Sequence, residues 1–174
     1  PTAETATILE ARGLRRTLGT GDLANEVLRG IDLSIRPVEF CSIIGPSGSG
    51  KSTLMYLLGG LDRPTSGEVF VDGASLSAMG PAALAGVRNR KIGFIFQFHY
   101  LMPEFTALEN VMMPMLKFGR GRDESKARAR ALLGDLGLAG KESRLPTQLS
   151  GGEQQRVSIA RSLANEPRVI LGDE

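Results

Sequence analysis

The chain has 174 residues, of which 41 % are hydrophobic and 23 % charged, and its formal net charge is +2. This composition is typical of one soluble globular domain, and so small a net charge gives no reason to expect a nucleic-acid partner. No apolar stretch approaches the roughly 18 residues that span a bilayer, the N-terminus lacks the features of a signal peptide, and the single cysteine, Cys41, fits a reducing cytosol.

The first part of the chain is predicted to form strands on either side of a glycine-rich loop. Alternating side chains at 7–12 and 26–36 predict two β-strands, and the polar stretch 19–25 between them predicts a hairpin or loop. The apolar run 40–44 predicts a buried strand of a parallel sheet, with Cys41 inside it. The elements predicted next are, in chain order, a helix over 51–58, a strand over 67–71, a short helix over 81–88 and a buried strand over 92–96.

After residue 98 the pattern becomes helical. Helical spacing at 108–116 and 123–136, with no strand between them, predicts a helical insertion, in which three methionines belong to the core and the charged residues of 123–136 form a solvated face. A further helix is predicted over 150–164 and a last strand over 169–171. Strands that alternate with helices imply an α/β fold with a mostly parallel sheet.

The first motif that carries chemistry is a complete G-x-x-x-x-G-K-[ST] pattern. Its glycines let successive backbone N–H groups point at one phosphate, and the helix that begins near Lys51 adds the positive end of its dipole. Lys51 supplies a charge for the β and γ phosphates, and the Ser52 hydroxyl suits Mg²⁺. The predicted phosphate-binding residues are Gly45, Pro46, Ser47, Gly48, Ser49, Gly50, Lys51, Ser52 and Thr53.

Two acidic residues close the last predicted strand. Asp173 and Glu174 follow the apolar run 169–171 and so lie at the carboxyl end of a strand, where open α/β sheets bind ligands. An acidic pair in this position is often only a turn. Paired with a phosphate loop, Asp173 is the expected partner of Mg²⁺, and Glu174 would orient or deprotonate the attacking water.

The third motif, Leu-Ser-Gly-Gly-Glu-Gln-Gln-Arg, covers residues 149–156. Ser150 and Glu153 form the pattern of a capping box, which is a sufficient structural reason for both. Gly151 and Gly152 in the first turn cost helix stability and are explained if a phosphate approaches the helix end closely. Since the chain already has one phosphate loop, this second helix end is predicted to serve the ATP of another subunit.

Taken together, these motifs resemble the Walker A, signature and Walker B motifs of ABC ATPases, and Gln97 resembles the Q-loop glutamine of that family. The resemblance runs over nearly the whole chain from Thr7. It implies an α/β P-loop NTPase fold, with a RecA-like parallel sheet, N-terminal antiparallel strands and a helical subdomain insertion. We expect a single ABC ATPase domain over 1–174, with its core at about 1–97 and 151–174 and its helical subdomain at about 98–150.

The resemblance also implies the cofactors and partners, which are ATP, Mg²⁺, a second copy of the chain in a head-to-tail dimer, and an integral membrane permease. The implied catalytic residues are Glu174, Gln97 and Lys51, and the implied Mg²⁺ ligands are Ser52, Gln97 and Asp173. The ATP bound by one subunit would be contacted in trans by Ser150, Gly151, Gly152 and Glu153 of the other. Such an ATPase is expected at the cytoplasmic face of the inner membrane, as a peripheral protein.

Within the family, residues 59–62 and 99–110 look like the lipoprotein-releasing branch. The macrolide-exporter and cell-division ATPases share much of this pattern, so both stay alternatives. An ABC protein of translation or DNA repair is a further alternative. Those proteins usually carry two ATPase domains, a long coiled coil or a metal hook, and none of these is visible in the sequence. A nucleotide-binding module without turnover is the last alternative.

Three departures from the family pattern qualify these expectations. Leu18 stands where an aromatic residue usually stacks on adenine, and Val38 stands in a turn that is usually Gly-Glu, where a positive φ would cause strain. The D-loop and switch histidine that should follow Glu174 are missing, and the only histidine, His99, lies beside Gln97. We therefore expect a domain that is incomplete at its C-terminus and hydrolyses ATP poorly by itself.

Overall fold

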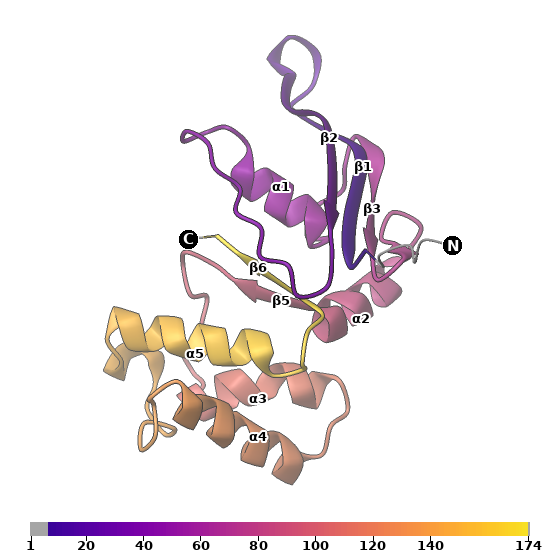
Figure 1. The fold of residues 1–174 in the computed structure, drawn as a ribbon. Helices are drawn as coiled ribbons and strands as arrows, with labels where there is room; N and C mark the ends of the chain where they lie inside the picture. The colour runs from indigo at the N-terminus through magenta and orange to yellow at the C-terminus, as the bar shows by residue number, and fades with distance from the viewer. Residues whose placement is uncertain (1–6, 174) are drawn as a thin grey trace. The chain divides into compact units, whose positions relative to one another are not determined.

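The computed structural model describes residues 7–173, without the side chain of Asp22. These residues fall into two compact units, which divide between Ala85 and Gly86, and Figure 1 draws the chain coloured by residue number. Each unit has its own sheet, and each is described by itself. None of the described helices is both long and apolar enough to cross a membrane.

The first unit is built on an antiparallel sheet, which confirms the predicted N-terminal strands. Its strands are β1 (Leu9–Leu18), β2 (Asn25–Ile35), β3 (Ser66–Val71) and β4 (Ala74–Ser75), in the order β2-β1-β3-β4. A short 3₁₀ helix, η1 (Gly21–Leu23), lies in the connection between β1 and β2. β1 runs on to Leu18, beyond the predicted end at Arg12, because its second half pairs with the start of β2, where Leu18 faces Asn25.

Apolar side chains from the sheet and from helix α1 (Lys51–Leu58) form the core of the first unit. Leu14 of β1 and Val71 of β3 are fully buried, and Leu57 of α1 is almost fully buried. β1 and β3 approach closely at Gly67, whose φ is +86° and where an added Cβ would lie 2.4 Å from the carbonyl oxygen of Gly13. Only glycine fits such an approach.

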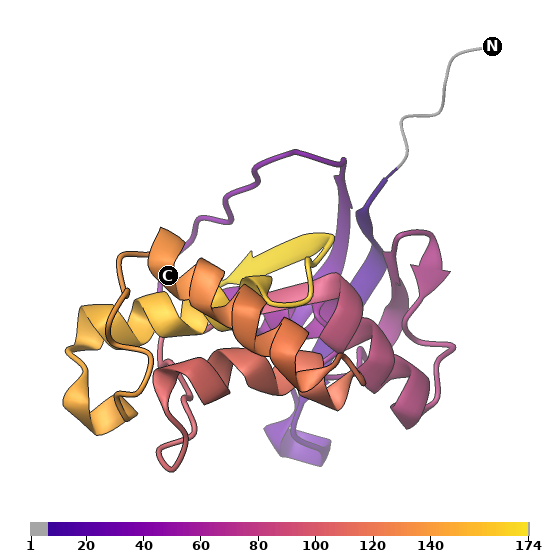
Figure 2. The same cartoon turned by 90° about the horizontal axis from the view of Figure 1, so that it is seen from below.

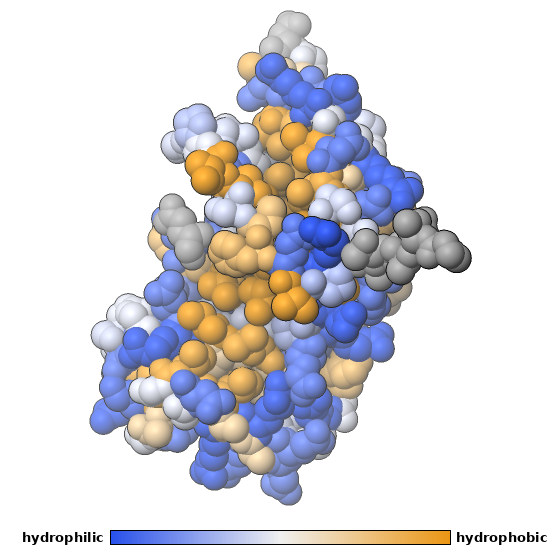
Figure 3. Space-filling model, viewed as in Figure 1, coloured by the Kyte–Doolittle hydropathy of each residue, from blue (hydrophilic) through white to orange (hydrophobic). Residues whose placement is uncertain are grey.

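The segment between β2 and α1 differs from its prediction. Residues 40–44 form no strand, and the side chains of Phe40 and Ile44 are 94 % and 92 % exposed. Cys41 is also exposed, so its prediction as a buried strand residue was wrong. An apolar run indicates that a segment is able to form a strand, but a strand also needs a partner for its N–H and C=O groups. Figure 3 shows hydrophobic surface, in orange, where Figure 1 draws this segment.

Val38, just before this segment, has a positive φ, the condition under which strain was expected at this position. Its φ is 63°, and its side chain is 107 % exposed. A β-branched residue in the left-handed region is a true outlier, because its Cβ crowds the backbone. The side chain therefore adds strain without adding packing.

Replacing Val38 by glycine should stabilise the protein by about 1 kcal/mol, since the strain relieved exceeds the chain entropy that glycine adds to the unfolded state. The melting temperature should rise by roughly 2–4 °C, as calorimetry would measure. Val38→Ala is the matched control, because it keeps the Cβ and hence much of the strain. If Val38→Gly lowered the melting temperature, strain at this position would be disproved.

The second unit contains a parallel pair of strands, β5 (Ile92–Ile95) and β6 (Val169–Gly172). Both strands were predicted from short apolar runs. Among residues 7–173, β5 and β6 form the one pair of strands that is parallel. Helix α2 (Pro81–Lys91) leads into β5. In the parallel register Ile95 lies opposite Gly172, so the carboxyl ends of β5 and β6 are level.

Three helices of the second unit enclose a hydrophobic core (Figures 1 and 2). They are α3 (Ala107–Lys117), α4 (Arg122–Asp135) and α5 (Gly151–Leu163), with a 3₁₀ turn, η2 (Pro146–Gln148), before α5. Met112 and Met115 are buried in this core, as the sequence predicted, whereas Met113, the third methionine, is half-buried and lies outside it. The other core residues are Ala107, Val111, Ala129, Leu133, Leu138, Leu149, Val157, Ala160 and Ala164.

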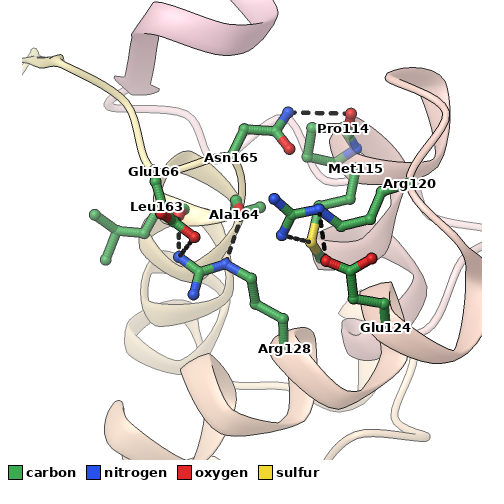
Figure 4. A network of polar contacts seen from close by, with 9 residues as sticks. All are labelled: Pro114, Met115, Arg120, Glu124, Arg128, Leu163, Ala164, Asn165 and Glu166. Atoms are coloured by element: carbon green, nitrogen blue, oxygen red, sulfur yellow. Dashed lines mark hydrogen bonds and ion pairs between the residues drawn. The ribbon is translucent and has the colours of Figure 1, made fainter.

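Polar side chains hold the C-terminal end of α5 (Figure 4). Arg128 of α4 donates to the carbonyl oxygens of Ala164 at 2.8 Å and Leu163 at 3.2 Å. Asn165 donates to the carbonyl oxygen of Pro114 in α3 at 3.1 Å. The prediction of a purely solvated face on α4 was therefore wrong for Arg128, because the carbonyl groups of the last helical turn lack partners within their own helix.

Candidate functional site

The glycine-rich loop comes directly before α1, as the sequence predicted. Residues 45–49 are exposed, and Lys51 is the first residue of the helix. The Lys51 ammonium donates to the carbonyl oxygens of Gly45 and Pro46, each at 2.9 Å. The positive charge that was predicted to meet a phosphate therefore lies against the loop itself.

The backbone of this loop needs its glycines. Gly48 and Gly50 have φ of +78° and +91°. At Gly50 an added Cβ would lie 2.9 Å from Cγ1 of Val27, so β2 approaches the loop too closely for any side chain. Gly50 is thus required both for its conformation and for the close contact.

The N-terminus of α1 fits an anion. Gly50 at the N-cap has no side chain to bond the first N–H groups, and the first turn of α1 contains no acidic residue. These N–H groups and the positive end of the helix dipole point away from the helix toward the loop. Together with Lys51, they form a donor set suited to a phosphate group.

Two of the predicted site residues come together in the second unit. Gln97 follows β5 and Asp173 follows β6, and the two strands end level with one another. The backbone N–H of Asp173 donates to the carbonyl oxygen of Ile95 at 3.0 Å, which extends the pairing past the end of β6. The structure thus brings Gln97 and Asp173 to one edge of the parallel pair, and Glu174 lies outside the described residues.

Metal ligation at the predicted Mg²⁺ residues would use oxygen atoms of three kinds. Ser52 has a hydroxyl, Gln97 an amide oxygen and Asp173 a carboxylate, and such oxygen ligands suit Mg²⁺, which usually keeps several waters. Among residues 7–173 no group of three or more His, Cys, Asp or Glu side chains could hold a metal ion. Ser52 belongs to the first unit, and Gln97 and Asp173 belong to the second.

The predicted capping box begins α5. The Ser150 hydroxyl accepts from the backbone N–H of Glu153 at 3.4 Å, and the Glu153 carboxylate accepts from the backbone N–H of Ser150 at 2.7 Å. Gly151 and Gly152 are exposed. An added Cβ would meet nothing within 4 Å at Gly151 and only the Arg156 guanidinium, 3.8 Å away, at Gly152. The first turn of α5 is therefore open to an incoming group.

Lys141 neutralises the carboxylate at this helix end. Its ammonium forms an ion pair with Glu153, and this contact, together with the hydrogen bonds from Ser150, lowers the pKa of Glu153 to about 2. Without Lys141, an unbalanced negative charge would stand where an anion was predicted to bind. Lys141 was not identified from the sequence, because it lies twelve residues from Glu153 in a connection without a motif.

The depressed pKa of Glu153 predicts a pH dependence of stability. The stabilisation from the Lys141 ion pair is fully present above the ordinary pKa of about 4.5 and is lost as the pH falls through about 2. Lys141→Met should therefore melt below the wild type at pH 7, and the difference should shrink toward pH 2.5. Lys126→Met, at an exposed lysine of α4, is the control. A difference for Lys141→Met that is constant from pH 7 to pH 2.5 would contradict the assignment.

Leu18, which stands at the position expected for adenine stacking, is the last residue of β1 and is 43 % exposed. It is therefore available for an apolar contact with a ligand. His99, the only histidine, has a buried Nδ1 atom, and its carbonyl oxygen accepts a hydrogen bond from the Arg161 guanidinium.

Comparisons with known proteins show the family to which the chain belongs. A sequence profile described as "ABC transporter" matches residues 28–174. The chain is 54 % identical over 169 residues to the "Lipoprotein-releasing system ATP-binding protein LolD" of Aquifex aeolicus, and the match covers 97 % of this chain and 74 % of that protein. A protein of the same name from Geobacter metallireducens is 51 % identical, with 97 % of this chain and 75 % of that protein covered.

Solved structures resemble the fold as well. One is described as the dimeric structure of a post-hydrolysis state of the ATP-binding cassette MJ0796 bound to ADP and Pi, and it has a TM-score of 0.89 and 42 % identity. The match covers 95 % of this chain and 73 % of that one. A second, described as the dimeric structure of MJ0796, a bacterial ABC transporter cassette, has the same TM-score and identity.

Proposed function

Because this chain belongs to the ABC transporter family, we propose that it is the ATP-binding subunit of a transporter that releases lipoproteins. The observation that carries the proposal is the similarity to lipoprotein-releasing ATP-binding proteins over nearly the whole chain. The described site supports it, since an anion-binding loop and an open, capped helix end are both present.

ATP would be held first by its phosphates. Residues 45–53 would surround the β and γ phosphates with backbone N–H groups, and Lys51 would exchange the carbonyl oxygens of Gly45 and Pro46 for phosphate oxygens. Leu18 would give the adenine an apolar contact without stacking.

Mg²⁺ would be bound by Ser52, Asp173 and Gln97, and it would neutralise charge that develops on the transferred phosphate. Glu174 would accept a proton from the attacking water or orient it. Gln97 and Asp173 follow the level carboxyl ends of β5 and β6, a placement that supports the assignment of Gln97 to metal and water.

A second copy of the chain would complete each site. The solved relatives are described as dimers, and a head-to-tail arrangement of two such chains gives two equivalent sites. Ser150, Gly151, Gly152 and Glu153 of one subunit would then contact the ATP held by Lys51 of the other.

The permease would be an integral membrane partner, and the ATPase would lie at the cytoplasmic face of the inner membrane. We assign residues 98–150 to the helical subdomain that receives a coupling helix of the permease. Phe98 and Tyr100, which follow Gln97, are 69 % and 64 % exposed, as a docking surface requires.

The test is affinity purification of the full-length protein from native membranes, followed by reconstitution with whatever permease co-purifies. We expect a permease with few spans and a large extracytoplasmic domain, and ATP-dependent release of a lipoprotein from the reconstituted vesicles. The Lys51→Ala variant is the control, because it should co-purify with the same permease without driving release.

Other outcomes would identify the alternatives. Efflux of macrolides without lipoprotein release would favour the macrolide-exporter branch. Recovery of cell-division proteins would favour the cell-division branch. If only ribosomes, DNA or soluble proteins were recovered, the assignment to a transporter would be wrong. That result would not contradict the proposed ATP hydrolysis.

A further inference from the structure

Arg161, in the last turn of α5, reaches the loop that follows Gln97. One terminal nitrogen of its guanidinium donates to the carbonyl oxygen of Tyr100 and the other to that of His99, both at 2.8 Å. Burial lowers the pKa of the Arg161 guanidinium, but arginine stays charged at any physiological pH. These two charge-assisted hydrogen bonds join segments that lie about sixty residues apart in the sequence.

The loop that Arg161 holds has a conformation that needs support. Tyr100 has a φ of 45°, which is unfavourable for a non-glycine residue. Its ring lies edge-on to Phe96 with centroids 5.4 Å apart, and Phe96 stacks on Phe94 of β5 at 5.5 Å. Gln97 therefore lies between a residue packed on β5 and a pair of carbonyl groups fixed by Arg161. A strained loop conformation persists only where its surroundings determine it.

α5 carries Arg161 near one end and follows Ser150 at the other. The helix is a continuous element, so the position of its N-terminal turn is coupled to whatever holds its last turn. We propose that Arg161 is a positioning residue, which fixes the backbone after Gln97 to the helix that begins at the signature motif. This inference rests on the proposed function, in which Gln97 contacts Mg²⁺ and water while Ser150 contacts ATP in trans.

Arg128 provides a matched comparison. It also donates two guanidinium hydrogen bonds to backbone carbonyl groups near the end of α5, those of Ala164 and Leu163 (Figure 4). Both residues thus anchor the same helix, but Arg128 anchors it to α4 and Arg161 anchors it to the loop of Gln97. A merely structural role predicts the same effect for both substitutions.

The experiment uses the full-length protein and its Arg161→Met, Arg161→Lys and Arg128→Met variants in steady-state ATPase assays. For Arg161→Met we expect kcat to fall by about tenfold with KM within about twofold, because a misplaced catalytic group slows the reaction more than it weakens binding. Arg161→Lys should recover part of kcat, since one ammonium can still donate to the carbonyl groups. Arg128→Met should lower the melting temperature with kcat within about twofold.

A second readout does not depend on ATP. Amide hydrogen exchange should quicken at residues 97–101 in Arg161→Met but not in Arg128→Met. Equal losses of kcat in both methionine variants, or unchanged exchange at 97–101, would overturn the proposal. If the wild type failed to hydrolyse ATP, the proposed function would fail, and the exchange experiment would still decide whether Arg161 positions the loop.

Discussion

Lys51→Ala is expected to reduce the rate of ATP hydrolysis by about 10²–10³-fold, which is the loss typical when one preorganised donor to a developing charge is removed. The ammonium lies against the loop backbone, where it donates to the carbonyl oxygens of Gly45 and Pro46. A neutral methyl group cannot offset the charge of a phosphate. Phosphate release by the full-length protein would measure the effect.

Lys126→Ala serves as the control for Lys51→Ala, because Lys126 is an exposed lysine on α4 with no place in the predicted site. Its rate should match that of the wild type. The melting temperature of Lys51→Ala should stay close to that of the wild type, because Lys51 is not fully buried and alanine favours the helix that begins there. A Lys51→Ala variant that hydrolyses ATP at the normal rate would remove the phosphate loop from the mechanism.

Asn110→Leu is expected to destabilise the protein by about 3 kcal/mol, although the two side chains are similar in size. Asn110 is fully buried in α3. Its Oδ1 accepts from the backbone N–H of Met102 at 2.8 Å, and its Nδ2 donates to the carbonyl oxygens of Phe105 at 2.9 Å and Thr106 at 3.1 Å. Leucine would leave these backbone groups without partners in a buried setting, which costs more than a lost hydrogen bond.

Thermal unfolding would measure the effect of Asn110→Leu, and the melting temperature should fall by roughly 6–12 °C. Asn25→Leu is the matched control, since Asn25 is exposed at the start of β2 and the same substitution there should change stability little. If the melting temperature of Asn110→Leu stayed within about 2 °C of the wild type, less than a 1 kcal/mol loss produces, water would have replaced the amide.

Helix positions were predictable from the sequence to within one residue, except that α2 runs to Lys91, three residues past its predicted end. α1 begins and ends where the lysine after the glycine loop and the Gly59-Gly60 pair indicated. α5 follows from its capping box, in which Ser150 and Glu153 bond each other's backbone. These signals are local, so the sequence contains all the information that they need.

The predicted strand at 40–44 is absent because a strand depends on a non-local signal. An apolar run indicates that a segment suits a buried strand, but the segment that would pair with it lies elsewhere in the chain. Phe40 and Ile44 are exposed, and no pairing of this segment is found among residues 7–173. β5 and β6, whose apolar runs look similar, became strands because they pair with each other.

In the candidate site too, residues in local motifs were predictable and residues with distant partners were not. Motifs identified the phosphate loop and the capped helix end, and the level ends of β5 and β6 bring Gln97 and Asp173 to one edge. No motif marks Lys141 or Arg161, whose partners lie far from them in the sequence. Asn110 is detectable in the sequence as a polar residue among the apolar positions of α3. Its four hydrogen bonds could not be inferred from the sequence.

The separate core of α3, α4 and α5 bears on the order in which the chain folds. All its buried residues lie between Ala107 and Ala164, and none of them belongs to the antiparallel sheet. The sheet is likewise closed by its own residues, through the β1–β2 hairpin, where Leu18 faces Asn25, and through the pairing of Leu9 with Val71. Elements that bury their own apolar side chains are able to form as separate cooperative units. The helical core is therefore able to assemble while the sheet is still open, and it does not depend on the sheet to begin.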